Sequence, residues 1–125
     1  KGFIMPELQK ISVDGWPLAA VAIFIALDFA SGLAKAWVSK TLSSTTMREG
    51  LVHKFTYIIL IALAVAVEVF QLHFEVFSGF PTAIAVCCYV CLTEVISIVE
   101  NIAEINPDLQ SWPLVQNILN KGKEE

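Results

Sequence analysis

A chain of 125 residues with a formal net charge of −4 has room for one ordinary domain. Its composition excludes an ordinary soluble domain, because 56% of the residues are hydrophobic and only 16% are charged. The mean hydropathy of +0.68 agrees with that exclusion. The chain also lacks a basic stripe, so we expect no nucleic-acid partner.

Three long apolar segments follow one another, at residues 16–38, 55–72 and 80–103. Each comes close to or exceeds the roughly 20 helical residues that cross a hydrocarbon core of about 30 Å. A soluble bundle of this size could not cover such segments, because its helices need a polar outer face. The sequence therefore predicts an all-α membrane protein: a lead at 1–15, three transmembrane helices at 16–105, and a short amphipathic C-terminal helix with a charged tail at 106–125.

The first segment has an alternative reading as a secretory signal. Residues 16–27 would be its apolar core, and residues 34–36 resemble a small-residue cleavage site. However, Asp28 interrupts the run before that site, and the acidic residues Glu7 and Asp14 precede it. We therefore expect an uncleaved first helix.

This first helix is predicted to have two distinct faces. One is a polar stripe of Asp28, Ser31, Gly32, Lys35 and Ser39, and the other carries Ala22, Ala26, Ala30 and Ala34 at intervals of four. Small residues at this spacing let membrane helices approach closely, although alanine is also simply common in such helices. We predict that the four alanines and Gly32 are helix-packing positions.

The connection at residues 40–54 sets the expected orientation. Lys35, Lys40, Arg48 and Lys54 crowd it, whereas the turn at 71–79 has no lysine or arginine. The positive-inside rule then places the first connection and the C-terminus in the cytoplasm and the N-terminus outside. Residues 46–49 also have capping-box spacing, which predicts that a helix begins there.

The third segment combines a lipid-compatible face with an acidic one. On a helix at about 100° per residue, one side collects the polar residues Thr93, Glu94, Ser97, Glu100, Asn101 and Glu104. The acidic face must meet water or protein. In the second segment Glu68 similarly shares a face with Tyr57, Ala64 and Gln71.

Acids inside the spans are expensive, at about 2.5–3.5 kcal/mol each near the bilayer centre. Asp28, Glu68 and Glu94 are deep in their segments, and Lys35 is the only base expected nearby, within reach of Glu100 or Glu104. We therefore expect that one subunit cannot neutralise its deep acids pairwise. They line water between several copies, or they join helices through hydrogen bonds. The candidate pore-lining or interhelical polar residues are Asp28, Ser31, Lys35, Glu68, Glu94, Ser97, Glu100 and Asn101.

No catalytic set is visible in the sequence. There is no plausible nucleophile–base pair, no glycine-rich phosphate loop and no HExxH motif. Cys87, Cys88 and Cys91 lie away from both histidines, whereas a zinc site needs four converging ligands. We interpret these cysteines as small apolar helix residues, and we expect neither an enzyme nor a cofactor or metal.

Three short sequence motifs follow one another along the chain. Residues 28–36 read DFASGLAKA, residues 50–54 read GLVHK, and residues 94–101 read EVISIVEN, with Ser43 and Ser44 in between. This series resembles the phage lysis holin family of phages of Gram-positive bacteria, which includes the clostridial toxin-release holins. In that family Asp-x-x-x-Gly-x-x-x-Ala, Gly-Leu-x-x-Lys and Glu-x-x-Ser-Ile-x-Glu-Asn occur in this order. The likeness covers residues 28–107, is loose over the tail, and does not extend to the lead.

The resemblance implies a multi-pass protein that accumulates in the bacterial host's cytoplasmic membrane. Such a protein oligomerises with itself into lesions, releases an endolysin with which it forms no stable complex, and so times host lysis. Two alternatives stay open: an antiholin-like regulator that joins such a pore without forming one, and a small proton-coupled membrane carrier or assembly factor.

Overall fold

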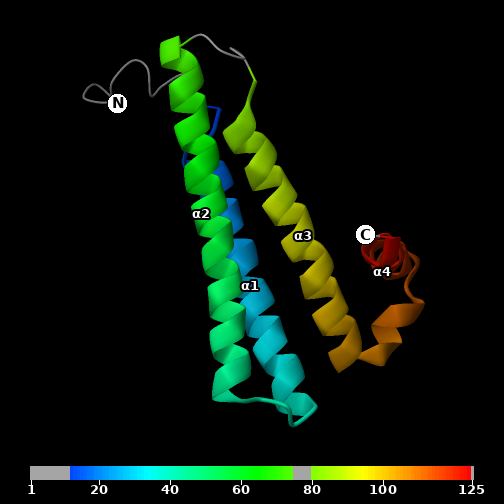
Figure 1. Cartoon of the computed structure of the whole chain (residues 1–125). Coiled ribbons are helices and arrows are strands. Elements are labelled where there is room, and N and C mark those ends of the chain that lie inside the picture. Colours follow the sequence, from blue (N-terminus) through cyan, green and yellow to red (C-terminus); the bar gives the residue numbers. More distant parts are fainter. Residues whose placement is uncertain (1–11, 75–79, 125) are drawn as a thin grey trace.

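The computed structural model describes residues 12–74 and 80–124, and over these residues the regular structure is helical (Figure 1). The elements in chain order are α1 (Gly15–Val38), α2 (Ser44–Phe74), α3 (Thr82–Ile105), the 3₁₀ helix η2 (Pro107–Ser111) and α4 (Pro113–Glu124). Figure 1 shows α1 and α3 running in one direction and α2 in the other. Helices α1, α2 and α3 are each long and apolar enough to cross a membrane. The predicted fold class is confirmed, while most of the lead and residues 75–79, in the turn between α2 and α3, lie outside the described residues.

Helix α1 is closed at both ends by local hydrogen bonds. Asp14 Oδ1 accepts from the Trp16 N–H at 3.0 Å. At the other end Lys40 has a φ of 60°, which turns the chain as in a Schellman motif. Trp16 and Trp37 are 84% and 74% exposed, and at 1.5 Å per residue they are about 32 Å apart along the helix. This separation fits the two interfaces of a bilayer, where tryptophan is enriched.

Helix α2 begins earlier than the capping-box spacing predicted. Its first residue is Ser44, and the Ser43 hydroxyl accepts from the Thr46 N–H at 3.1 Å. A serine in this position satisfies a free N–H of the first turn, so the helix begins before Thr46. Lys54 consequently lies about three turns inside α2.

Helices α2 and α3 each have a row of residues that faces the interior of the bundle. Helix α3 packs most extensively against α1 and less against α2, and α1 touches α2 only slightly. The inner residues of α2 and α3 follow alternating spacings of three and four, as in coiled coils. On α2 these are Lys54, Tyr57, Ile61, Ala64, Glu68 and Gln71, and on α3 they are Ala83, Cys87, Val90, Glu94, Ser97 and Asn101. An apolar core of Val21, Ile61, Cys87 and Val90 lies among them.

The third span ends where the sequence predicted. Asn106 is the C-cap of α3, and Pro107 opens η2. Because proline cannot continue the helix, the chain turns, and α4 lies across α3 beside its C-terminal half (Figure 1). Val115, Ile118 and Leu119 are half-buried, whereas Gln116, Asn117 and Asn120 are exposed. The predicted amphipathic C-terminal helix is thereby confirmed.

Candidate functional site

Three charged side chains, one from each membrane-length helix, meet inside the bundle. The Lys54 ammonium of α2 donates to Glu94 Oε1 and Oε2 of α3 at 2.9 and 2.8 Å and also to Asp28 Oδ2 of α1. Glu94 is 1% exposed and Asp28 6%. We call Asp28, Lys54 and Glu94 the charged cluster.

This cluster overturns the expectation that one subunit lacks a base for its deep acids. The sequence pattern groups Lys54 with the basic residues of the first connection and leaves Lys35 as the only base expected nearby. Lys54 lies within α2 on its inward face, at the level of Asp28 and Glu94. Two of the three deep acids therefore share one base within a single subunit.

Asn101 extends the cluster along α3. Its Nδ2 donates to Asp28 Oδ1 at 3.2 Å and to Ser31 Oγ at 3.0 Å. The Ser31 hydroxyl itself donates to the Asp28 carbonyl at 3.1 Å. Among the described residues, no buried side-chain nitrogen or oxygen lacks a hydrogen-bond partner. Asp28, Ser31, Glu94 and Asn101 are thus brought together as an interhelical network, and any role in lining a pore stays a prediction about an assembly.

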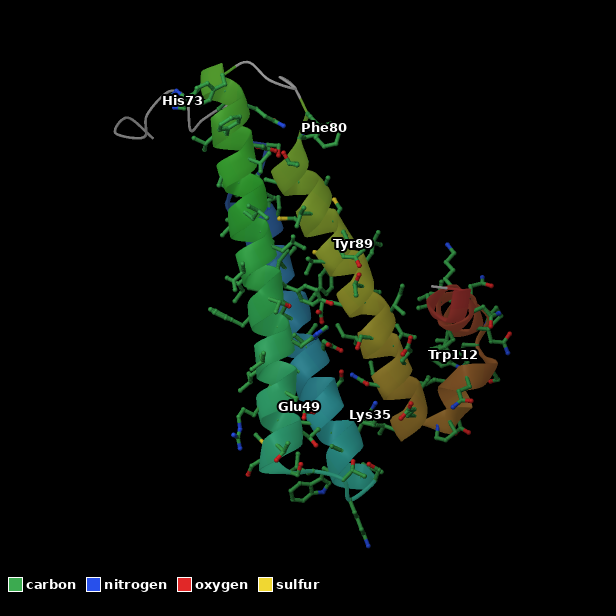
Figure 2. The ribbon with its side chains drawn as sticks, in the orientation of Figure 1. Lys35, Glu49, His73, Phe80, Tyr89 and Trp112 are labelled. Carbon is green, nitrogen blue, oxygen red and sulfur yellow. The ribbon has the colours of Figure 1, made fainter. Side chains whose placement is uncertain are left out.

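The remaining predicted polar residues of α1 and α3 lie nearer the end at the α1–α2 connection. Lys35 Nζ is 3.7 Å from Glu104 Oε2, which confirms one of its two expected partners. Ser97 is half-buried beside the cluster, and Glu100 is exposed. Figure 2 shows Lys35 at this lower end of the bundle, with Glu49 of α2 also there.

Glu68 takes part in a second polar site at the opposite end. Its Oε1 accepts from the Ala83 N–H at 2.8 Å, and its Oε2 accepts from the Ser12 N–H at 2.8 Å. The Ser12 hydroxyl donates to Glu68 and accepts from the Ile84 N–H at 3.1 Å. Pro81 gives α3 no side-chain cap, so Glu68 and Ser12 satisfy the free N–H groups of its first turn. No sequence pattern indicates Ser12 as part of a site, because the family resemblance does not extend to the lead.

The four predicted packing alanines of α1 are not used inside the subunit. Ala22, Ala26, Ala30 and Ala34 are all exposed, and the first two line an apolar groove of about 460 Å³ between α1 and α2. Gly32 faces inward, where an added Cβ would lie 3.7 Å from Asn101 Nδ2. The alanine ridge is available to another helix, and its packing role stays a prediction.

No metal centre is formed within the part of the chain that the structure describes. No group there of three or more His, Cys, Asp or Glu side chains could hold an ion. Cys87 is buried in the apolar core, Cys91 is half-buried and Cys88 is exposed, and all three thiols are free.

Fold and site together define a small multi-pass helical membrane protein whose three spans meet around buried charges. A family model described as the bacteriophage holin family matches residues 11–120. The chain therefore belongs to the bacteriophage holin family, as the ordered motifs predicted. No curated protein and no solved structure matches the chain.

Proposed function

We propose that the chain is a holin that forms lesions in the cytoplasmic membrane of a bacterial host and lets an endolysin reach the cell wall. Membership of the bacteriophage holin family across residues 11–120 is the observation that carries this proposal. Three helices of membrane length support it. The endolysin passes through the lesion without forming a stable complex, and the three-helix unit at 16–105 is the part that makes the lesion.

The lesion forms between copies of the chain, because three helices are too few to enclose a lumen. The exposed ridge of Ala22, Ala26, Ala30 and Ala34 supports self-association, since small residues on a membrane helix allow close backbone approach. The first connection and the C-terminus face the cytoplasm in this proposal, and the N-terminus lies outside.

The internal pairing of the acids supports two states of the subunit. In the closed state Lys54 holds Asp28 and Glu94 inside the bundle. Lining a lesion with Glu94 and Ser97 requires α3 to leave α2 and break the Lys54–Glu94 bonds. Separating a buried ion pair is costly, so water must replace those bonds as subunits assemble. This exchange favours an abrupt transition over a gradual leak.

Expression in bacteria with and without an endolysin tests the proposal. We expect the chain alone to stop growth and collapse the membrane potential, and the chain with an endolysin to lyse the culture. A matched control is the chain with Ala26→Leu, which should accumulate but assemble poorly. Unharmed cells at full accumulation would contradict the proposal. Delayed lysis on co-expression with another holin would then identify a regulator, and proton flux without leakage of large solutes would identify a carrier.

A further inference from the structure

A cavity lined by both polar and apolar side chains leads from the α1–α2 connection to the charged cluster, and Phe29, Leu33, Leu42 and Met47 are among its apolar lining. Its volume is about 550 Å³, and Asp28, Lys54, Ser97 and Asn101 line its inner part. Further polar lining comes from the outer residues Lys35, Thr41, Thr46, Glu49 and His53. A cavity with this much room and this many polar partners is the kind that holds water.

The other side of the cluster is bordered by apolar side chains, including those of the apolar groove between α1 and α2, which Lys54 also lines. Val21, Ile61, Cys87 and Val90 form the buried core there, with exposed fractions of 8% or less. Ala64 and Ala83 are also buried between this core and the end where Glu68 lies. The interior of the subunit is therefore polar towards the α1–α2 connection, and the apolar core separates the charged cluster from the Glu68 site at the opposite end.

The cluster lies near the middle of the first span. At 1.5 Å per residue, Asp28 is about 14 Å from Trp37 and about 18 Å from Trp16 along α1. With both indoles at the interfaces, the cavity crosses roughly half of a hydrocarbon core of about 30 Å.

The cluster holds two carboxylates and one ammonium group, so its formal charge is −1 when all three are ionised. An uncompensated charge at this depth is unfavourable. Uptake of one proton from water, forming an O–H bond on one carboxylate, brings the formal charge to zero. The titratable or charged groups near the cluster include Lys35 on α1 and Glu49, His53 and Tyr57 on α2. On α3 they include Cys91, one turn from Glu94, and Glu104, which pairs with Lys35.

We infer that the cavity is an aqueous half-channel through which protons from the α1–α2 side alone reach the charged cluster. The closed subunit then responds to the proton concentration of that compartment, which is the cytoplasm in the orientation proposed above. The apolar core separates the cluster from the other compartment.

Sided thiol labelling tests the half-channel in sealed proteoliposomes that retain a trapped dye. In a background of Cys87→Ala, Cys88→Ala and Cys91→Ala, Ser97→Cys places a thiol in the cavity, and Gly32→Cys is a second probe if the first fails to fold. Val52→Cys is the matched control, because Val52 is 62% exposed on the outside of α2 at a similar depth. Thr45→Cys, in the exposed first turn of α2, marks the accessible side.

A charged, membrane-impermeant thiol reagent should label the cavity thiol only from the side that labels Thr45→Cys. The same reagent should not label Val52→Cys from either side. Labelling of the cavity thiol from both sides, from neither side, or only from the side opposite to Thr45→Cys overturns the inference.

Infrared absorption of the protonated carboxyl group tests the proton itself. A pH change on the α1–α2 side should alter the intensity of a carboxyl band, and the same pH change on the other side should leave that band unaltered. The band should be absent from the double variant that carries Asp28→Asn and Glu94→Gln. A band that responds equally from both sides, or no responsive band, contradicts proton access. Neither readout requires lysis, so a protein that passes both tests without lysing cells would overturn only the proposed function.

Discussion

Lys54 on α2 donates to both carboxylate oxygens of Glu94 on α3, at 2.9 and 2.8 Å. Lys54 therefore supplies hydrogen-bond donors to the carboxylate of Glu94 in the middle of the third span. The acidic side of α3 is an internal surface of the closed subunit at this level. In the proposed function, exposing it to a lumen requires α2 and α3 to separate, which makes this pair the contact that the proposed lesion must replace.

Lys54→Met should destabilise the subunit, because it leaves Asp28 and Glu94 buried without their base. Removing one partner of a buried pair costs about 3–5 kcal/mol, measured as the free energy of unfolding in mixed detergent micelles. Lys121→Met is the matched control, since Lys121 is exposed on α4. The triple variant with Asp28→Asn and Glu94→Gln should recover most of the loss. A Lys54→Met variant as stable as the unmodified chain would contradict the internal pairing.

Glu94→Gln should delay the onset of lysis. The substitution leaves Asp28 and Lys54 as a balanced pair, so the closed subunit gains less from exposing the cluster to water. The measurement is the time from induction to loss of culture density at matched protein levels, with Glu100→Gln as the control on the exposed side of α3. Earlier lysis with Glu94→Gln would count against the two-state account.

Glu68→Ala should loosen the start of α3, because the Ala83 N–H then loses its acceptor. Loss of a helix cap costs about 1 kcal/mol, and Ser12→Ala should have an effect of similar size through the Ile84 N–H. The free energy of unfolding in detergent measures both, and Glu100→Ala is the control. If neither variant differs from the control, the polar site at this end does not hold α3.

Ala26→Leu should weaken oligomers, because a bulky side chain on the alanine ridge keeps a second helix at a distance. Chemical cross-linking in membranes reports this as fewer high-order bands. Ala66→Leu is the matched control, since Ala66 is also exposed but lies on α2 away from the ridge. Unchanged band patterns for Ala26→Leu would remove the ridge from the interface.

The three spans and the C-terminal helix could be predicted because long apolar runs and the Asn106–Pro107 stop are local signals. Lys54 is not predicted as the partner of Glu94, because it directly precedes the apolar run and groups with the basic loop. Its position in the three-and-four spacing that includes Ile61 and Glu68 was the signal that could have placed it inside.

Ser12 could not be predicted from local pattern. Its partners Glu68 and Ile84 are 56 and 72 residues away in the chain, and a single serine in a mixed lead carries no periodic signal. Its role follows from the free N–H groups at the start of α3, which only the assembled bundle brings next to the lead.

Size-graded release from liposomes containing the purified chain tests the proposed lesion most directly. Liposomes would carry a small dye together with a labelled polymer as large as a folded endolysin. The account predicts that both are released together once the protein density passes a threshold, and that Ala26→Leu raises that threshold. Retention of the polymer at every density, with or without loss of the dye, would contradict the account.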